Sequence, residues 1–266
     1  MSRYLRLLGV EKSGADRELL DRLVRAHATR VPFESISKLH YFRTLGLTEI
    51  PDIDLYLEGI EQYSFGGTCY ANNAHFCRLL QTLDFEASLC GADMGSGEDV
   101  HAAIVVRIDG RDLLIDAGYA APFLVPIPLN ENADVVVRFG RDRYVLSPRD
   151  EWSRSRLDLY REGELIHGYL LKPHPRPVAH FDAVVRQSFR AEATFMNAVM
   201  LVRYAADASI AIHNLSVVRS TATAFHLERL TGREDLVRAI VSEFGMPESL
   251  IREVVAHVPM TGDPYR

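Results

Sequence analysis

The period of the hydrophobic pattern changes near residue 86, and this change constrains the fold more than any other feature. Before it, apolar residues recur every three or four positions, which is the spacing of one helix face. Helices are predicted over residues 16–30, 52–62 and 69–83. After it, apolar and polar residues alternate, as in half-buried strands. The sequence therefore predicts an α+β protein in which a helical part precedes a β part.

The β part begins with the clearest turn signal in the chain. Residues 101–108 and 111–118 alternate on either side of Asp109-Gly110, a typical two-residue hairpin turn. Further strands are predicted over 134–138, 142–147, 156–161 and 165–171. Several short antiparallel strands in succession favour a β-barrel or a β-sandwich.

Proline marks the next boundary, because KPHPRP at residues 172–177 breaks every regular pattern. This segment is predicted to be an extended connector between domains. Beyond it, strands are expected over 198–204 and 209–218, followed by two helices. We therefore predict three domains: a helical domain (1–85), a β domain (86–177) and a mixed α/β domain (178–266).

Composition excludes several classes of partner. The 266-residue chain has a formal net charge of −6, which disfavours a nucleic-acid or anionic-membrane partner. Cys69, Cys77 and Cys90 are an odd number without CxxC spacing, so neither a disulfide framework nor a metal site is expected. No apolar stretch approaches the roughly 18 residues of a membrane span. We expect a cytoplasmic protein and make no prediction of its oligomeric state.

Cys69 stands where a reactive thiol is favoured. FGGTC (65–69) places two glycines directly before a cysteine that opens a predicted helix. The unpaired N–H groups and partial positive charge of a helix N-terminus favour thiolate over thiol, and they could hold an oxyanion. The alternative is that Cys69 is a small buried side chain, as most free cysteines are.

The register of the predicted hairpin supplies two partners for such a thiol. If Asp109-Gly110 is the turn, Arg107 faces Asp112, which makes a sensible ion pair. Asp116 then lies diagonally from His101 on the same face, about 7–8 Å away at Cα. A cysteine, a histidine and an aspartate suit the roles of nucleophile, base and orienting carboxylate. Periodicity alone does not bring Cys69 to this hairpin.

Four segments, in order and with compatible spacing, resemble motifs of the arylamine N-acetyltransferases. They are YLRLLG (4–9), RVPFESIS (30–37), FGGTCYANNAHFCRLLQTLDF (65–85) and HAAIVVRIDGRDLLIDAGYAAPF (101–123). The resemblance implies a helical N-terminal domain, an antiparallel β-barrel and a C-terminal α/β lid around a cysteine-protease-like core. It also implies that Cys69, His101 and Asp116 form the catalytic triad.

The resemblance implies a ping-pong reaction in which acetyl-CoA, the acyl donor, acetylates Cys69. An arylamine, arylhydrazine or N-hydroxyarylamine then accepts the acetyl group, as in xenobiotic metabolism, and no metal takes part. Six further residues are candidates for the ligand sites. Gly95, Ser96 and Gly97 could admit the CoA thioester or form a plain connector, and Phe33, Tyr119 and Phe123 could line the acceptor pocket or the core.

Two departures from the family pattern flank the nucleophile. Phe65 stands where the family has arginine, and Ala71 where it has glutamate. Both changes leave the candidate nucleophile in place but put the pocket shape and the acceptor in doubt. Three alternatives therefore stay open: an amide synthase of aromatic polyketide biosynthesis, a thiol hydrolase or transglutaminase-like enzyme, and a catalytically silent binding protein.

Overall fold

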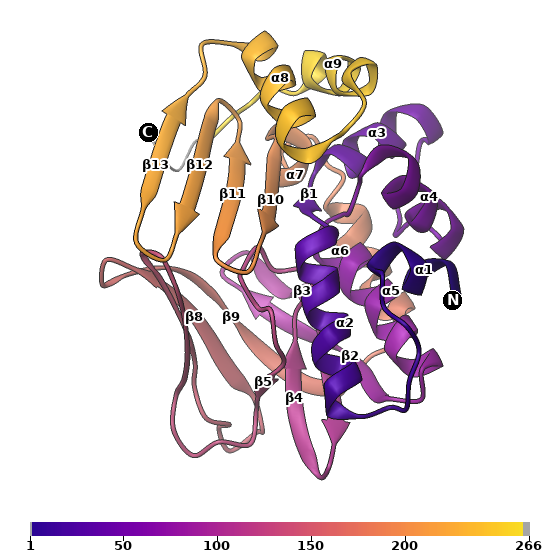
Figure 1. Cartoon of the computed structure of the whole chain (residues 1–266), viewed down its shortest axis with the longest axis vertical. Helices are drawn as coiled ribbons and strands as arrows, with labels where there is room; N and C mark the ends of the chain where they lie inside the picture. The colour runs from indigo at the N-terminus through magenta and orange to yellow at the C-terminus, as the bar shows by residue number, and fades with distance from the viewer. Residues whose placement is uncertain (1, 263–266) are drawn as a thin grey trace.

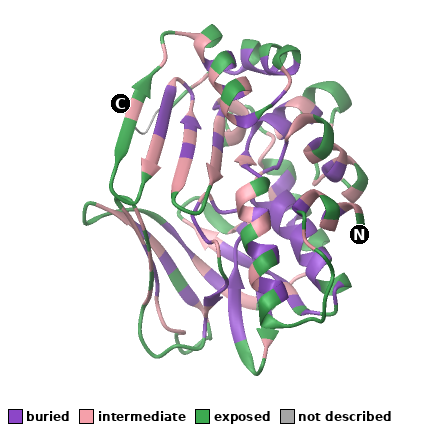
Figure 2. Ribbon diagram, in the orientation of Figure 1, coloured by how far each residue is buried: buried purple, intermediate pink, exposed green. Residues whose placement is uncertain are grey.

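The computed structural model describes residues 2–262 and confirms the α+β fold. Figure 1 shows a helical N-terminal part, a curled sheet below it and beside it, and a second sheet that carries the last two helices on one side. Figure 2 shows that burial concentrates where the helical part meets the curled sheet, and that the outer hairpins are mostly exposed.

The predicted helices form, with small shifts at their ends. The N-terminal part contains α1 (Ser2–Leu8), α2 (Arg17–Arg30), α3 (Ile36–Leu45), α4 (Ile53–Tyr63) and α5 (Cys69–Thr82). Asp16 caps α2, because its carboxylate accepts a 2.8 Å hydrogen bond from the Leu19 N–H. Asp52 caps α4 through the Leu55 N–H in the same way.

An antiparallel sheet of eight strands forms the barrel-like part, in the order β5-β4-β3-β2-β9-β8-β7-β6. The strands are β2 (Glu86–Met94), β3 (Gly97–Ile108), β4 (Arg111–Ile115), β5 (Ile127–Pro128), β6 (Val135–Phe139), β7 (Asp142–Leu146), β8 (Ser155–Arg161) and β9 (Glu164–Pro175). The sheet curls around a core that includes Tyr144, Leu157, Tyr169 and Leu171. The expected barrel architecture is therefore confirmed, with β5 and β6 as its two edges.

The register predicted for the hairpin of β3 and β4 is confirmed. Ile108 pairs with Arg111 and Arg107 with Asp112, and Arg107 Nε lies 3.0 Å from Asp112 Oδ1. Arg149 Nη2 reaches the second carboxylate oxygen of Asp112 at 2.9 Å. Asp109 and Gly110 both have positive φ, as this turn requires.

Two expectations for the strands were wrong. Residues 172–175 continue β9 and do not form an irregular connector, because β9 pairs with β2 in the middle of the curled sheet. Residues 209–218 are not one strand: β11 (Ala208–His213) and β12 (Ser216–Thr221) are separated by a turn at Asn214, whose φ is 52°. Asn214 Oδ1 accepts a hydrogen bond from Val199 N at 2.9 Å, which holds this turn.

The second sheet joins both ends of the chain. Its order is β1-β10-β11-β12-β13, and β1 (Phe33–Glu34) comes from the N-terminal part. The remaining elements are η1 (Val178–Phe181), α6 (Asp182–Gln187), α7 (Thr194–Asn197), β10 (Met200–Tyr204), β13 (Phe225–Arg229), α8 (Arg233–Phe244) and α9 (Glu248–His257). Since α5 also shares a hydrophobic cluster with β2 and β3, the parts are tightly joined. The division into three domains stays a prediction.

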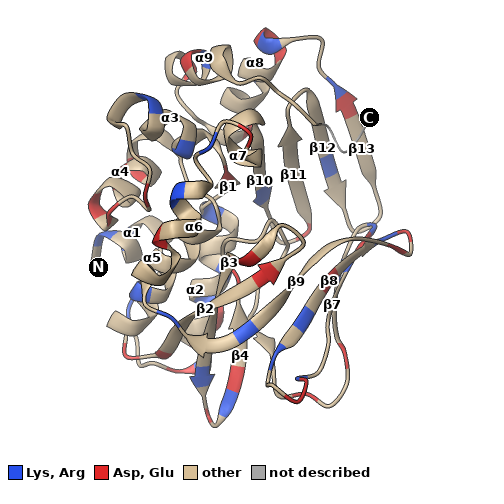
Figure 3. Ribbon diagram, turned by 180° about the vertical axis from the view of Figure 1, so that it is seen from behind, with Lys and Arg blue, Asp and Glu red and all other residues tan. Residues whose placement is uncertain are grey.

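Charged residues of both signs are interspersed over the face seen in Figure 3. Within residues 2–262, no helix combines the length and the apolar character that crossing a membrane requires. Across the same residues, no cluster of histidine, cysteine and acidic side chains has an arrangement that could hold a metal ion.

Candidate active site

The loop before Cys69 is pressed against the N-terminal part of the chain. A Cβ on Gly66 would lie 1.9 Å from the Pro32 carbonyl oxygen, so only glycine fits there. The buried carboxylate of Glu34 accepts hydrogen bonds from Gly66 N at 3.0 Å and from Ser37 N at 2.8 Å. This anchoring places Cys69 as the first residue of α5.

The N-terminus of α5 leaves donors available beside the thiol. Thr68, the residue before the helix, has extended backbone angles, and its side chain makes no capping hydrogen bond. The first N–H groups of a helix lack partners within the helix and attract negative charge. They are therefore suited to stabilise either a thiolate or the oxyanion of a tetrahedral intermediate.

His101 and Asp116 form a buried pair at the end of the β3–β4 hairpin. His101 Nε2 lies 2.7 Å from Asp116 Oδ2, and the two side chains are 3% and 0% exposed. Asp116 follows the last residue of β4, so its side chain keeps the face that the hairpin register predicts. The structure thus brings together the two residues that the sequence pairs.

Asn73, on the next turn of α5 after Cys69, connects the helix to this pair. Its Nδ2 donates to Asp116 Oδ1 at 2.8 Å and to the Ala102 carbonyl at 2.6 Å. Its Oδ1 accepts a hydrogen bond from Ala117 N at 2.9 Å. One fully buried amide therefore fixes the helix, the histidine strand and the aspartate loop relative to one another.

Gly118 allows the aspartate loop to lie directly against the start of α5. A Cβ at this position would stand 2.4 Å from Cys69 Cα and 2.6 Å from Asn73 Nδ2. The Gly118 N–H also donates to Asp116 Oδ1 at 3.1 Å. This close approach is the contact between Cys69 and the hairpin that periodicity does not predict.

The surroundings of His101 favour its protonated form. Burial by itself lowers the pKa of the imidazole, but the charge and hydrogen bond of Asp116 and a hydrogen bond with Cys69 outweigh it. The pKa of His101 is raised to about 10. An imidazolium beside the thiol suits an activated cysteine. Burial raises the pKa of the Cys77 thiol and of the Cys90 thiol to about 12, which disfavours the thiolate form of both.

The three predicted acceptor-pocket residues lie at different distances from this centre. The Tyr119 ring is 5.6 Å from the His101 ring, and its hydroxyl lies 2.5 Å from His167 Nδ1. Phe123 is one ring further away and belongs to the barrel core. Phe33 pairs with Gly67 of the cysteine loop. Tyr119 thus lies beside His101, and Phe33 lies beside the loop that precedes Cys69; the role of both residues in binding stays a prediction.

Gly95, Ser96 and Gly97 lie at the exposed tip of the β2–β3 hairpin. The segment is therefore a tight turn between two long strands. It meets the active-site helix indirectly, because the Tyr70 hydroxyl donates to the Asp99 carbonyl at 2.6 Å. A role for this turn in binding a CoA thioester stays a prediction.

The two departures from the family pattern have clear structural settings. Phe65 is buried among the rings of His40, Tyr41 and Tyr63. Ala71 packs against Gly67, where a Cβ would stand 2.9 Å from the Ala71 Cβ. The loop is therefore held by an apolar ring cluster and by the carboxylate of Glu34.

Sequence reasoning did not single out Asn73 or Gly118. The spacing from Cys69 to Asn73 is four residues, which puts both on one face of α5. That spacing was the available signal for Asn73. For Gly118 no local signal distinguishes a close contact from an ordinary turn.

Replacing Gly118 with alanine tests the contact between the helix and the loop. We expect Gly118→Ala to lower the free energy of unfolding by about 2–4 kcal/mol, because the added methyl group clashes with the α5 backbone. Urea unfolding followed by circular dichroism measures this change. Gly14→Ala is the control, since a Cβ there meets nothing within 4 Å. Equal stabilities of the two variants would contradict the assigned contact.

The His101–Asp116 pair should leave a signature in the pH dependence of stability. Because folding raises the pKa of His101, its stabilising contribution is complete below the unfolded value near 6.5 and disappears as pH rises towards about 10. We expect the free energy of unfolding of wild type to exceed that of Asp116→Asn by on the order of a few kcal/mol at pH 6.5, and this difference to shrink by pH 10. Urea unfolding at each pH measures it. Asp109→Asn in the exposed turn is the control, and a pH-independent difference for Asp116→Asn would refute the prediction.

Comparisons with known proteins agree with this geometry. A family model described as N-acetyltransferase matches residues 16–249. Proansamycin X synthase of Amycolatopsis mediterranei is 23% identical over 177 residues, which is 64% of this chain and 67% of that protein. Arylamine N-acetyltransferase 1 of Homo sapiens is 27% identical over 135 residues, or 47% of this chain and 45% of that protein. The latter match spans less than half the length of the human relative.

Solved structures show the same fold over nearly the whole chain. The arylamine N-acetyltransferase from Mycobacterium abscessus superposes with a TM-score of 0.81 at 18% identity, covering 96% of this chain and 94% of its own. The Mycobacterium marinum enzyme in complex with CoA gives 0.80 at 16% identity, covering 97% and 98%. Because the family model matches most of this chain, the chain belongs to the arylamine N-acetyltransferase family and is an acyltransferase.

Proposed function

We propose that this enzyme transfers the acetyl group of acetyl-CoA to an arylamine, arylhydrazine or N-hydroxyarylamine through an acetyl-thioester on Cys69. The observation that carries the proposal is the arrangement around Cys69: the residue opens α5, its thiol interacts with the His101 imidazole, and Asp116 lies 2.7 Å from that imidazole. The CoA complex of the M. marinum relative supports a CoA thioester as the donor.

In the proposed first half-reaction, the Cys69 thiolate attacks the thioester carbonyl of acetyl-CoA. A new carbon–sulfur bond forms to Cys69, and the bond to the CoA sulfur breaks. The N–H groups at the start of α5 stabilise the oxyanion, and imidazolium His101 protonates the departing CoA thiolate.

In the second half-reaction, the acceptor nitrogen attacks the acetyl-Cys69 carbonyl. Neutral His101 removes a proton from the nitrogen, the bond to Cys69 breaks, and the amide leaves. Asp116 keeps the imidazole oriented in both steps through its 2.7 Å contact. The Asn73 hydrogen bonds hold that carboxylate in place.

Intact-mass spectrometry after mixing with acetyl-CoA tests the first half-reaction. We expect wild type to gain one acetyl group on Cys69, and Cys69→Ala to gain none, because no other thiol adjoins an imidazolium. Cys77→Ala is the matched control and should be acetylated like wild type. A wild-type protein that stays unmodified would refute the proposed thioester.

A second candidate is an amide synthase that releases or cyclises an aromatic polyketide. It is favoured by the match to proansamycin X synthase, which covers more of this chain than the matches to the mammalian enzymes. Such an enzyme would use the same Cys69 thioester, but with a larger acyl group and an amine supplied by the substrate itself.

Acyl-donor competition separates the two candidates. If the first proposal holds, Cys69 should be acylated faster by acetyl-CoA than by an aromatic N-acetylcysteamine thioester. The reason is that an acetyltransferase pocket fits a small acyl group, whereas an amide synthase pocket fits a bulky one. Stopped-flow thiol release measures both rates, and His101→Asn is the control that should lower both by at least about 100-fold. Faster acylation by the bulky thioester would favour the amide synthase, and release of free acid without an amine would favour a hydrolase.

A further inference from the structure

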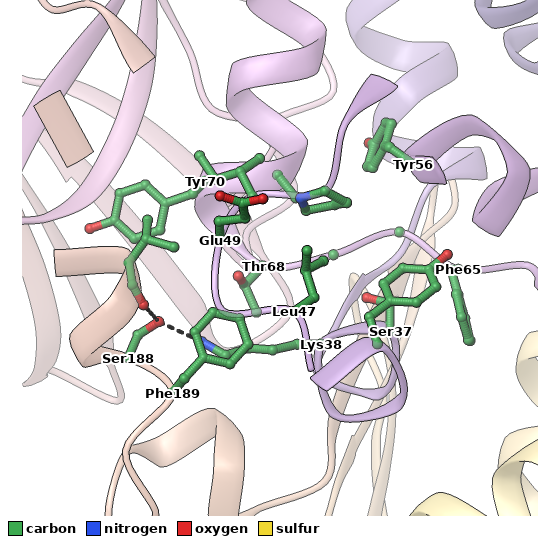
Figure 4. Close-up of a pocket in the computed structure, with 17 residues that line it drawn as sticks. Ser37, Lys38, Leu47, Glu49, Tyr56, Phe65, Thr68, Tyr70, Ser188 and Phe189 are labelled. Carbon is green, nitrogen blue, oxygen red and sulfur yellow. Dashed lines mark hydrogen bonds between the residues drawn. The ribbon is translucent and has the colours of Figure 1, made fainter. Parts of the chain in front are cut away.

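A pocket adjoins the cysteine loop and has a half-buried lysine, Lys38, in its wall. Figure 4 shows Lys38 from α3 beside Ser188 and Phe189, with Thr68 and Tyr70 of the nucleophile region nearby. The space between its lining residues, open solvent included, is about 540 Å³. Gly67 and Ala71 also line it, so the pocket lies against the chain on both sides of Cys69.

The Lys38 ammonium has polar and aromatic neighbours but no acid. Its Nζ donates to Ser188 Oγ at 2.5 Å and lies 4.0 Å from the centre of the Phe189 ring. Ser188 Oγ in turn donates to the Val185 carbonyl at 2.6 Å. Among residues 2–262, no carboxylate oxygen lies within 4.0 Å of Lys38 Nζ, and the nearby acid of the pocket wall, Glu49, is exposed.

The other two lysines show how this chain treats ammonium groups elsewhere. Lys172 Nζ lies 2.6 Å from Asp93 and 2.8 Å from Asp99, so its charge is balanced. Lys12 is exposed to water. A partly desolvated ammonium without a neighbouring carboxylate costs free energy, and such a position is stabilised when an anion binds. Lys38 is therefore prepared for an anionic group that the chain does not itself supply.

The departures from the family pattern shape the rest of the pocket. Phe65 and Ala71, which replace an arginine and a glutamate of the family pattern, both line it. Their side chains add apolar surface and bring no charge of their own to the wall. Apolar Leu47, Val185 and Phe189 continue this surface, so the pocket combines an apolar wall with one half-buried ammonium.

We propose that this pocket is a binding site for a small aromatic carboxylate. The ring would lie against Phe65, Val185 and Phe189, and the carboxylate would accept a hydrogen bond from Lys38 Nζ, which Ser188 Oγ positions. The site is independent of the acetyl transfer proposed above, because binding requires neither acetyl-CoA nor a reactive Cys69.

The environment of Lys38 predicts how binding depends on pH. Burial lowers the pKa of Lys38 to about 8, although the electrostatic interaction with Cys69 acts in the opposite direction and raises it. The titratable groups that share the pocket wall are Glu49, Tyr41, Tyr56 and Tyr70. Burial raises the pKa of all three tyrosines, so they stay neutral as Lys38 loses its proton. Carboxylate affinity should therefore fall as pH rises above about 8.

Ligand-observed NMR titration with 4-chlorobenzoate, and with neutral 4-chlorobenzamide of similar shape, tests the site. At pH 7 we expect wild type to bind the carboxylate at least about tenfold more tightly than the amide, since a hydrogen bond between two charged groups is stronger than one to a neutral amide. Lys38→Met should abolish this preference, and Lys12→Met, the matched control, should keep it. The same titration at pH 9.5 should weaken carboxylate binding to wild type by at least about tenfold.

Three outcomes would overturn the proposal: equal affinities for the two ligands in wild type, an undiminished preference in Lys38→Met, or a preference unaffected by pH 9.5. Thermal unfolding checks that Lys38→Met is folded, and Lys38→Arg, which keeps the charge, should retain part of the preference. Because these titrations contain no acetyl-CoA and measure binding alone, failure here is distinguishable from failure of the acetyl transfer.

Discussion

The close contact between the start of α5 and the aspartate loop is the constraint on which the rest of the site depends. Gly118 gives the loop room to lie on the Cys69 backbone, and Asn73 closes the contact with three hydrogen bonds to the loop and the histidine strand. Every one of these groups is buried or lies at a buried interface, so an unmade hydrogen bond would carry its full desolvation cost. The contact therefore sets the position of the thiol relative to the imidazole with little freedom.

Charge is handled differently on the two sides of the nucleophile. On the barrel side, the His101 imidazolium is matched by a buried carboxylate, which keeps it protonated near neutral pH. On the helical side, Lys38 lies in an apolar pocket without such a partner, and burial weakens its hold on the proton. The first arrangement suits an activated thiol, and the second suits a ligand that arrives with its own negative charge.

The strongly local patterns of the sequence were reliable predictors. The Asp109-Gly110 turn allows only one register for its strands, and both the Arg107–Asp112 ion pair and the face shared by His101 and Asp116 follow from it. The errors arose where a residue's neighbours in space outweigh its neighbours in the chain. Strand β9 accommodates Pro173 and Pro175 because its pairing with β2 is irregular there. Asn214 turns the backbone inside an otherwise continuous β pattern.

The sequence by itself determined the helical and β segments, the pairing of His101 with Asp116, and the helix start at Cys69, because each depends on interactions between residues near one another in the chain. The family motifs also indicated which of three cysteines is the candidate nucleophile. Only the tertiary structure decided that α5 packs on the hairpin, that Asn73 and Gly118 make this possible, and that Lys38 faces a pocket beside the cysteine loop. These contacts join residues tens of positions apart. No periodicity encodes that a Cβ at Gly118 would clash with α5, or that no carboxylate within residues 2–262 lies beside the Lys38 ammonium.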